Sequence, residues 1–379
     1  MHIADITMFY AARGGGVSTY LNAKARWLSQ RTQVRHTILS PNVATASGKT
    51  RTLVHLPSVA LPGIHGYRWP LSAGASAHIL RRLQPDLVEA GDAGPSALAA
   101  LRAKRQLDIP AVAFYHSDLP QLIGDRFGAA AAGAARKYLV HLYRQFDLVM
   151  APSRLMAKQL EGMGIRGVVH QPLGIDVDTF SPKRRIGLLR EHLHLAPDTR
   201  LLVFAGRFTA EKKLPLLIEA VRRLGPPYHL LLIGGGGNLP QIGQMTCVPF
   251  KRNQHDLARL LGSCDVLVHP GDRETFGLIV LEAMACGLPV IGTKGGAVSE
   301  LVDTDTGLLV EPNSVARLCE GIEAIYGCDR AEMGRKALRK AREQYDWEHV
   351  LPQLLGRYAG LLASRERAEL EVEPIVVTD

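Results

Sequence analysis

Short apolar runs alternate with amphipathic stretches along most of the chain, a pattern that predicts parallel strands joined by helices. Two helices of the first half are clearest. One begins near Gly16 and runs past Trp27, and the other extends from Ala129 to Phe146. The strands predicted there are His2–Met8, His36–Ser40, Leu87–Ala90, Ala111–Tyr115, Leu148–Ala151 and Val168–His170. We therefore expect a doubly wound α/β domain over residues 1–172.

The same alternation restarts after Pro172. The predicted strands of the second half are Leu201–Ala205, His229–Ile233, Thr246–Pro249, Val266–His269, Pro289–Thr293 and Gly307–Val310, with helices over Leu214–Leu224, Gln254–Gly262, Gly277–Cys286 and Val315–Gly327. The segment Gln171–Pro182 is rich in Pro, Gly and Asp, as an interdomain linker should be. We expect a second α/β domain over 173–346, a last helix over 347–363 and a flexible tail over 364–379.

The positive charge is unevenly distributed between the halves. Residues 1–170 contain 20 Lys and Arg against 9 Asp and Glu, whereas residues 171–379 contain 25 against 27. A basic domain indicates an anionic partner such as a membrane surface, a phosphorylated substrate or a nucleic acid, and a merely solubilising surface remains the alternative. Aromatic residues make up only 6% and no nucleic-acid-binding motif is present, so we expect no nucleic-acid partner.

Cysteine usage and the N-terminal residues bear on the cellular compartment. The five cysteines are odd in number and form no CxxC pair, which indicates neither a disulfide framework nor a zinc site. The first strand begins without a basic segment and carries Asp5, unlike a signal peptide. No apolar run is long enough to span a bilayer, and we expect a cytoplasmic protein.

Two glycine-rich loops follow predicted strands, Gly14–Gly16 and Gly234–Gly237. Glycines at a helix N-terminus let backbone N–H groups approach an anion. A dinucleotide fingerprint fails at the first loop because Thr19 stands in place of the third glycine and no acidic residue ends the strand His36–Ser40. An anion site and a plain tight turn both remain open.

Two D-x-D triplets, Asp176/Asp178 and Asp303/Asp305, could hold Mg²⁺ on a nucleotide diphosphate. Both stand in turn-forming segments, where Asp is favoured for local hydrogen bonding. We expect turns there and no bound metal.

A denser group of candidate residues surrounds the strand Leu201–Ala205. Arg207 and Lys212 follow its carboxyl end, where open α/β sheets bind ligands, and two cations in one loop suit a diphosphate. Glu274 and Glu282 are separated by seven residues, about two helical turns, so one carboxylate can stand at the mouth of a later helix and the other deeper on a nearby face. Carboxylates recognise sugar hydroxyls.

Between these two glutamates, Phe276, Gly277 and Leu278 open the helix, and their backbone amides could hold phosphate.

These motifs, together with ACGLPVIGTKGGAVSELV and GLLVEP downstream, resemble retaining glycosyltransferases of the GT-B fold, specifically glycosyltransferase family four. The first half adds YHSDLP at 115–120, APS at 151–153 and LGID-x-x-x-F at 173–180. The chain is most similar to bacterial mannosyltransferases that act on lipid acceptors, with plant-type sulfolipid synthases as near relatives. The resemblance extends to about Ala363 and implies two Rossmann-like domains facing a cleft, with the final helix packed back on the first domain.

The resemblance also implies roles for individual residues. Arg207 and Lys212 would hold the donor diphosphate and stabilise the leaving group, Glu274 would contact the donor sugar, Glu282 the ribose, and His116 would stand beside the anomeric carbon. The other donor contacts implied are Gly15, Gly16, Gly206, Val248, Phe250, Lys251, Phe276, Gly277 and Leu278. The family often has Lys-Gly where this chain has Lys212-Lys213, so the shape of this loop departs from its pattern.

The reaction implied is a hexosyl transfer on one face of the sugar, in which the departing phosphate takes the acceptor proton and neither metal nor cofactor is needed. GDP-mannose is favoured over UDP-glucose as donor, with a lipid or glycolipid acceptor at the inner face of the cell membrane. The alternatives are a UDP-glucose-type hexosyltransferase on a soluble or polysaccharide-precursor acceptor, a nucleotide-sugar epimerase or hydrolase, and a non-catalytic partner subunit, against which the intact charged motifs argue.

One helix combines apolar and basic residues in the manner of an interfacial element. Arg136, Lys137 and Arg144 punctuate Ala129–Phe146, and Arg126 precedes it. This composition predicts binding to an anionic membrane surface, unless the segment Ala129–Ala135 packs in the core.

Overall fold

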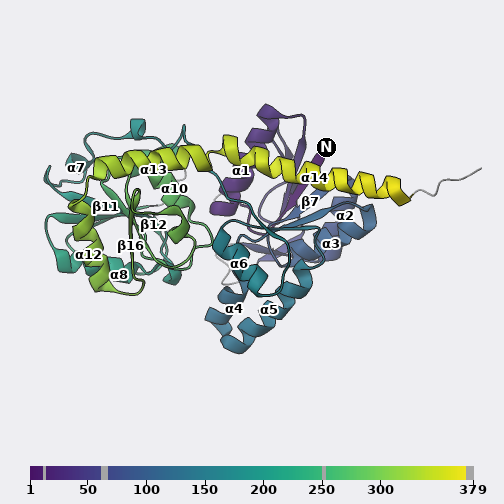
Figure 1. Cartoon of the computed structure of the whole chain (residues 1–379), viewed down its shortest axis with the longest axis horizontal. Coiled ribbons are helices and arrows are strands. Elements are labelled where there is room, and N and C mark those ends of the chain that lie inside the picture. The colour runs from purple at the N-terminus through teal and green to yellow at the C-terminus, as the bar shows by residue number, and fades with distance from the viewer. Residues whose placement is uncertain (12–13, 61–66, 250–252, 373–379) are drawn as a thin grey trace, which may run out of the picture. The chain divides into compact units, whose positions relative to one another are not determined.

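The computed structural model describes residues 1–11, 14–60, 67–249 and 253–372 and divides the chain into two compact units (Figure 1). Unit 1 comprises Met1–Pro172 and Val350–Asp379, and unit 2 comprises Leu173–His349. Each unit has its own mainly parallel sheet, and helices connect most of its consecutive strands. The two Rossmann-like α/β domains predicted from the apolar pattern are therefore present.

The sheet of unit 1 has the strand order β10-β9-β8-β7-β1-β2-β4-β3, parallel except for β3. Its strands are β1 (His2–Ile6), β2 (Arg35–Ser40), β3 (Ala46–Ser47), β4 (Thr52–His55), β7 (Leu87–Ala90), β8 (Ala111–Phe114), β9 (Leu148–Ala151) and β10 (Val168–His170). Its helices are α1 (Gly16–Arg31), α2 (Ala73–Leu83), α3 (Pro95–Leu107), α4 (Leu119–Phe127), α5 (Ala129–Tyr143) and α6 (Arg154–Gly162). A separate antiparallel pair, β5 (Ser58–Ala60) with β6 (Arg68–Pro70), lies between β4 and α2. The sequence pattern did not predict β3 to β6.

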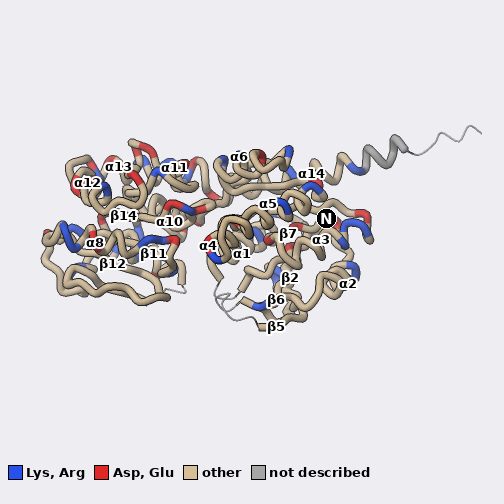
Figure 2. Tube along the Cα trace, turned by 90° about the horizontal axis from the view of Figure 1, so that it is seen from below, with Lys and Arg blue, Asp and Glu red and all other residues tan. Residues whose placement is uncertain are grey.

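Helix α5 is shorter than predicted and more exposed. It ends at Tyr143 rather than Phe146, because the next residues form tight turns in which Gln145 N–H donates to the Leu142 carbonyl. Its buried residues are Leu139, Leu142 and Tyr143, and none of the residues 129–135 is buried. The alternative prediction that this alanine-rich segment packs in the core is therefore wrong. Figure 2 marks the Lys and Arg positions of both units.

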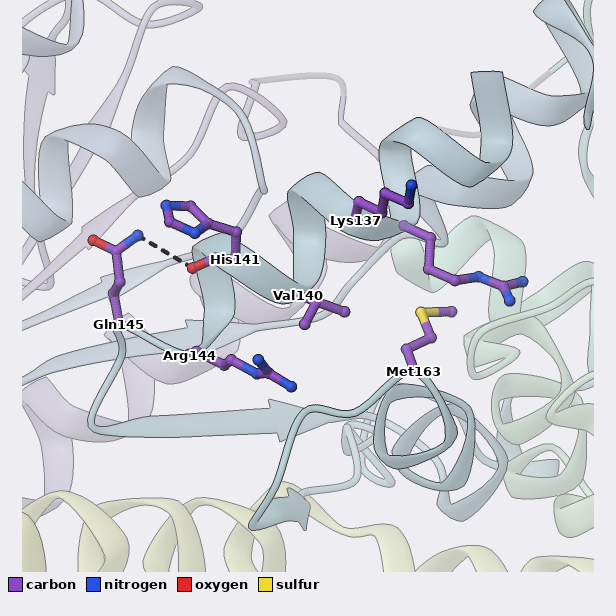
Figure 3. Close-up of a pocket in the computed structure, with 7 residues that line it drawn as sticks. Lys137, Val140, His141, Arg144, Gln145 and Met163 are labelled. Atoms are coloured by element: carbon purple, nitrogen blue, oxygen red, sulfur yellow. Dashed lines mark hydrogen bonds between the residues drawn. The ribbon is translucent and has the colours of Figure 1, made fainter. Parts of the chain in front are cut away.

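A cavity of about 510 Å³ opens along the second half of α5. It is lined by Arg136, Lys137, Val140, His141, Arg144, Gln145 and Met163, and Val140 and Met163 face each other across it (Figure 3). Because α5 and α6 lead into the amino ends of β9 and β10, this cavity lies away from the carboxyl edge of the sheet.

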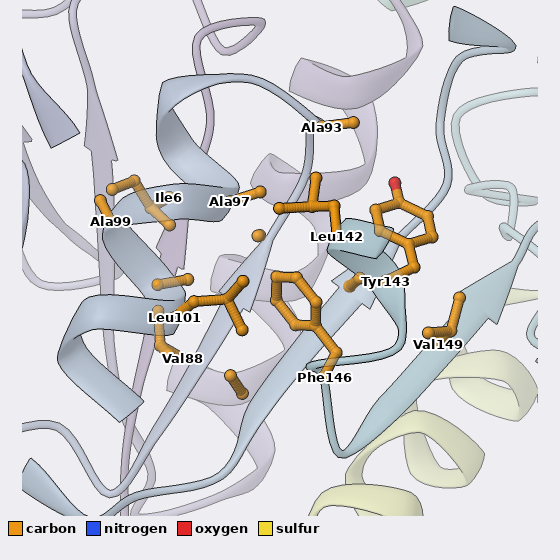
Figure 4. Close-up of a cluster of buried hydrophobic side chains, with 14 of the residues drawn as sticks. Ile6, Val88, Ala93, Ala97, Ala99, Leu101, Leu142, Tyr143, Phe146 and Val149 are labelled. Atoms are coloured by element: carbon orange, nitrogen blue, oxygen red, sulfur yellow. The ribbon is translucent and has the colours of Figure 1, made fainter. Parts of the chain in front are cut away.

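The core of unit 1 packs small against large side chains. Helix α3 contributes Ala97, Ala99, Ala100 and Ala103, while Leu142, Tyr143 and Phe146 enter from α5 and the turn after it (Figure 4). Alanines let a helix approach a sheet closely, and the aromatic rings fill the remaining volume at the density of a folded interior.

Helix α14 (Trp347–Val372) continues nine residues beyond the predicted end at 363. The segment ASRERAELEV has strong helix formers, so the helix extends through residues that were expected to begin a flexible tail. The rest of that expected tail, 373–379, lies outside the described residues. From Val350 onward α14 belongs to unit 1, where Arg365 pairs with Asp108 and Arg357 Nε lies 2.9 Å from Gln171 Oε1.

A buried cluster of charges joins α14 to the sheet of unit 1. Lys24 Nζ lies 2.8 Å from Asp5 Oδ1, 3.3 Å from Glu89 Oε2 and 2.9 Å from the Tyr358 hydroxyl. Tyr20 and His36 also bond these carboxylates. We call Asp5, Tyr20, Lys24, His36, Glu89 and Tyr358 the Lys24 cluster.

Unit 2 is built on a wholly parallel sheet of order β13-β12-β11-β14-β15-β16. Its strands are β11 (Arg200–Arg207), β12 (Tyr228–Gly235), β13 (Met245–Pro249), β14 (Val266–Val268), β15 (Val290–Thr293) and β16 (Gly307–Val310). Its helices are α7 (Leu189–His192), α8 (Leu214–Leu224), α9 (Gln254–Gly262), α10 (Leu278–Ala285), α11 (Val298–Leu301), α12 (Val315–Tyr326) and α13 (Arg330–Tyr345), with short 3₁₀ turns at Pro182–Arg184 and Ala210–Lys212. Each predicted strand of this half is found within two residues of its predicted ends.

Candidate functional site

The carboxyl ends of β11 and β14 bring four of the predicted residues to one edge of the unit 2 sheet. Gly206 and Arg207 end β11, and Lys212 ends the 3₁₀ turn that follows. Glu274 lies in the loop between β14 and α10. Lys212 Nζ and Glu274 Oε1 form an ion pair whose side chains are 20% and 18% exposed, so both groups remain accessible to a ligand.

A histidine that the sequence analysis did not single out completes this pair. His269 Nε2 lies 3.0 Å from Glu274 Oε1, and its ring is buried next to Phe204. Burial pushes the pKa of Glu274 up, but the Lys212 ammonium and the hydrogen bond from His269 outweigh it and hold that pKa well below its usual value. Glu274 is therefore a carboxylate at neutral pH.

Arg207 is exposed at the carboxyl end of β11, in the segment that leads to Lys212. Its guanidinium makes no hydrogen bond or ion pair within the described part of the chain. Because an arginine offers five donors in a planar fork, Arg207 is free to bind an anion such as a phosphate.

Glu282 lies on α10 with its side chain buried, at 8% exposure. Its carboxyl group makes no hydrogen bond to any residue in the described ranges. Burial raises the pKa of Glu282 to about 7. A buried carboxyl group without a protein partner is suited to a ligand that supplies hydroxyl donors.

The start of α10 is shaped by a residue with positive φ. Gly277 has φ +100° and precedes Leu278, the first residue of the helix. Phe276 is buried and packs edge-on against Tyr345, with ring centroids 6.1 Å apart. The helix N-terminus thus begins shortly after Glu274 along the chain, at a glycine turn next to a buried phenylalanine.

Close backbone approaches at this edge require glycine. A Cβ on Gly234 would lie 1.9 Å from the carbonyl oxygen of Gly206, so β11 and β12 could not pair there with any other residue. Gly296 has φ +63°, and a Cβ on it would lie 2.8 Å from the amide nitrogen of Glu274. The glycine run at 234–237 is therefore structural at its first position.

The remaining donor candidates of unit 2 lie on and after its edge strand. Val248 is half-buried near the end of β13. Phe250 and Lys251 lie outside the described residues.

In unit 1 the predicted residues lie at the carboxyl ends of β1 and β8. Gly15 precedes α1, Gly16 begins it, and both are exposed, with open space where a Cβ on Gly15 would stand. His116 follows β8, and its ring stacks on Phe114 at 4.2 Å and lies 5.3 Å from that of Tyr20. Burial lowers the pKa of His116 to about 3, so the imidazole is neutral at pH 7.

The two D-x-D triplets form turns. Asp176 Oδ1 accepts hydrogen bonds from the amides of Asp178 and Thr179, and Asp303 Oδ1 accepts from those of Asp305 and Thr306. In the ranges that the structure covers, no group of three or more His, Cys, Asp or Glu side chains could hold a metal ion.

A second ion pair, also missed from the sequence, lies beside the first. Lys213 pairs with Asp272, and both contact Asn313. The only sequence signal was the presence of Lys213 where glycine is common in the family.

Comparisons with known proteins agree with this architecture. Residues 14–179 match the family Glycosyltransferase Family 4, and residues 187–344 match Glycosyl transferases group 1. The chain is 27% identical, over 96% of its length and 97% of the other protein, to a GDP-mannose-dependent alpha-(1-6)-phosphatidylinositol dimannoside mannosyltransferase of Mycobacterium tuberculosis.

Two further similarities support the family and the fold. The chain is 31% identical to a GDP-mannose-dependent alpha-mannosyltransferase of M. tuberculosis, over 76% of each chain. The structure of a sucrose-phosphate synthase from Thermosynechococcus elongatus superposes with a TM-score of 0.82 at 20% identity, over 96% of this chain and 100% of that one. The protein is thus a glycosyltransferase of the GT-B fold, and it belongs to glycosyltransferase family 4.

Proposed function

We propose that the protein transfers mannose from GDP-mannose to a hydroxyl group of a lipid or glycolipid, with retention of the anomeric configuration and without a metal ion. The two mycobacterial relatives named above support the choice of donor, and the phosphatidylinositol dimannoside in the name of the first supports a lipid acceptor. The observation that carries the chemistry is the carboxyl edge of unit 2, where β11 ends at the unpaired Arg207 and the next turn brings Lys212 to Glu274.

The charges at this edge suit a departing diphosphate. As the bond from the anomeric carbon to the phosphate oxygen breaks, negative charge grows on that oxygen, and Arg207 and Lys212 stabilise it. The acceptor oxygen forms its bond to the same carbon on the same face, and its proton passes to the leaving phosphate. Before these steps, when the donor binds, Glu274 exchanges Lys212 for hydroxyl groups of the sugar.

The residues of unit 1 serve the sugar and the acceptor in this proposal. A neutral His116 can donate or accept one hydrogen bond, which fits a sugar hydroxyl better than a phosphate. The exposed glycines before α1 leave space for an anionic group at a helix N-terminus.

The donor is tested by ligand-dependent stability and by turnover. The melting temperature of the chain should rise more with GDP than with UDP or ADP at equal concentration, because a ligand that binds the native state stabilises it by RT ln(1+[L]/Kd). GDP-mannose should then be consumed with an α-linked product when lipid acceptor is present. A larger shift with UDP, together with turnover of UDP-glucose, would favour the alternative hexosyltransferase. Hydrolysis without any acceptor would favour a hydrolase.

The acceptor is proposed to lie in the inner leaflet of the cell membrane, with the protein bound to its surface. Helix α4 exposes Leu122 and Phe127 at 55% and 67%. Arg136, Lys137 and Arg144 stand along α5 around the apolar Val140 and Met163 of the open cavity. This combination fits phosphate headgroups at an anionic interface. None of the helices within the described ranges is long and apolar enough to cross a bilayer.

Liposome flotation tests this surface. The protein should float with anionic but not with neutral vesicles, and salt should weaken binding because it screens exposed charges. At about 1 kcal/mol for each basic residue near the surface, Arg136→Glu with Lys137→Glu should reduce binding tenfold or more. The same double reversal at Arg335 and Lys336 of α13 is the control and should change little. Equal binding to both vesicle types, or none, would remove the membrane from the proposal.

A further inference from the structure

Lys213 adopts a left-handed backbone conformation, which is disfavoured for any residue that has a Cβ. Its φ and ψ are +52° and +33°, in the left-handed region, and it caps α8. A helix N-cap ordinarily has extended backbone, and a residue with a Cβ is disfavoured in the left-handed region. Some interaction of the side chain must therefore offset the cost of placing lysine here.

The Lys213 side chain connects three loops at the carboxyl edge of the unit 2 sheet. Its ammonium pairs with Asp272 Oδ2 in the loop after β14 and donates to Asn313 Oδ1 in the loop after β16. Asn313 Nδ2 donates to the same Asp272 oxygen at 3.3 Å. Asn313 also has positive φ, at +61°, so two strained residues meet at one carboxylate.

This contact lies directly beside the pair proposed to bind donor. Lys212 pairs with Glu274, while Lys213 pairs with Asp272, two residues earlier in the same loop. The two loops are thus joined by two adjacent ion pairs. Burial pushes the pKa of Asp272 up, but Lys213 outweighs it and holds that pKa below its usual value, so this second pair stays charged at neutral pH.

The two pairs differ in what a donor would do to them. A diphosphate takes the Lys212 ammonium and a sugar takes the Glu274 carboxylate, so donor binding separates the first pair. Lys213, Asp272 and Asn313 are not among the proposed donor contacts, and their bonds remain. Without the Lys213–Asp272 pair, neither ion pair would join the two loops once the donor has separated Lys212 from Glu274.

Resting on the proposed function, we propose that Lys213 is a positioning residue: with Asp272 and Asn313 it holds the loops after β11, β14 and β16 together while the Lys212–Glu274 pair opens to admit the nucleotide sugar. Lys213 itself does not touch the donor. Its effect is to reduce the ordering that donor binding must otherwise impose on these loops.

Substitutions at Lys213 separate this role from a purely structural one. Lys213→Gly removes the side chain and relieves the backbone, and Lys213→Met removes the charge but keeps the aliphatic stem. Both should raise the KM for GDP-mannose and the Kd for GDP, measured by calorimetry, about tenfold, with kcat at saturating donor changed less than about threefold, because the contact is lost equally from ground and transition states. Lys213→Arg should restore most of the affinity.

The matched control is His194→Gly. His194 also has positive φ, at +56°, and is exposed in unit 2 just before β11, away from the carboxyl edge. This variant should leave KM, kcat and the Kd for GDP unchanged. Asn313→Gly, which preserves the backbone preference and removes only the amide, should weaken GDP binding about threefold, because Lys213 and Asp272 still pair.

Two results would overturn the proposal. One is a KM and a GDP affinity within twofold of the unmodified protein in both Lys213→Gly and Lys213→Met. The other is a parallel loss of kcat and melting temperature that Lys213→Arg does not reverse. If the unmodified protein uses UDP-glucose instead, the donor assignment fails while the same comparison with UDP still decides the role of Lys213. Binding of neither nucleotide would overturn both proposals.

Discussion

Each of the two units pairs a lysine with carboxylates, two for Lys24 in unit 1 and one for Lys212 in unit 2, but the lysines are buried to very different extents. In unit 1, Lys24 and its partners Asp5 and Glu89 are at most 2% exposed. In unit 2, Lys212 and Glu274 are 20% and 18% exposed. Charges that water cannot reach can only bind each other, whereas charges at an open edge can exchange partners. The same residue types thus form a closed, buried cluster in one unit and, in the other, an accessible pair at which we propose that the donor binds.

The Lys24 cluster satisfies its buried charges with hydrogen bonds from several elements. Burial raises the pKa of Glu89, while Lys24 and His36 overcome burial and lower that of Asp5. Tyr358 of α14 bonds both Lys24 and Glu89, and so ties the last helix to the sheet. A buried ion pair contributes little net stability by itself, but losing one partner leaves an uncompensated charge.

The largest expected effect follows from removing that partner. Lys24→Met leaves Asp5 and Glu89 buried without their cation and should lower the free energy of unfolding by about 3–5 kcal/mol, measured by urea denaturation. Lys294→Met, which removes the exposed pair with Glu311, is the control and should leave the midpoint unchanged. If Lys24→Met lowered the free energy of unfolding by less than about 1 kcal/mol, the Lys24 cluster would not have the stabilising role expected of it.

At the open edge of unit 2, by contrast, we expect a substitution to reduce activity without reducing stability. Arg207→Ala should lower kcat by about 10²-fold or more, comparable to losing one oxyanion donor, because the guanidinium would no longer stabilise the leaving diphosphate. The unfolding midpoint should not change, since Arg207 has no partner elsewhere in the described chain. Near-normal kcat in a folded Arg207→Ala variant would remove it from the catalytic site.

The two units also show which parts of the fold could be predicted from the sequence and which could not. Strand periodicity predicted the strands of both parallel sheets except β3 and β4, because buried parallel strands are continuous apolar runs. It missed the pairs β3–β4 and β5–β6, whose residues are mostly exposed or half-buried and so lack that signal. Asp5 inside the first apolar strand was the one sign of the Lys24 cluster, but its partners at Lys24 and Glu89 are brought together only by the fold.

The candidate site, too, was predicted only in part. Residues at strand ends, such as Arg207 and Glu274, follow from the rule that parallel sheets bind ligands at their carboxyl edge. His269 and Asp272 were missed because a histidine and an aspartate in a loop have no spacing that identifies their partner. Lys213 pairs with Asp272 across 59 residues of sequence, a contact set by the order of β11 and β14 in the sheet.

A pH-dependent effect separates stability from binding at Glu282. Burial raises the pKa of Glu282 from 4.5 in the unfolded chain to about 7, so the folded state holds a proton that the unfolded state has lost between these values. The resulting contribution to stability is complete below pH 4.5 and disappears as the pH rises through 7. Glu282→Gln should therefore raise the free energy of unfolding at pH 8, by on the order of 2 kcal/mol.

Nucleotide binding should respond in the opposite sense. Ribose hydroxyls donate to a carboxylate, so GDP affinity of the unmodified protein should rise as the pH increases past 7, and Glu282→Gln should bind GDP about tenfold more weakly and lose this pH dependence. Urea denaturation and calorimetry at pH 6 and pH 8 measure both quantities. A variant that is more stable and binds equally well would exclude Glu282 from the donor site.

The smallest expected effect concerns metal removal. Two carboxylates at the open edge already have cationic partners, since Glu274 pairs with Lys212 and Asp272 with Lys213. Asp303, which precedes the amino end of β16, accepts turn amides and pairs with Lys340. A divalent ion would have to displace a lysine at each of these three carboxylates, whereas in the proposed site Arg207 and Lys212 would face the diphosphate. Turnover of GDP-mannose in excess EDTA should stay within about twofold of the untreated rate, and added Mg²⁺ should not increase it.

Sodium chloride matched to the ionic strength of the Mg²⁺ addition is the control, because exposed charges are screened by any salt. Loss of turnover in EDTA with recovery on Mg²⁺ or Mn²⁺ would show that a metal, and not Arg207 with Lys212, neutralises the leaving group.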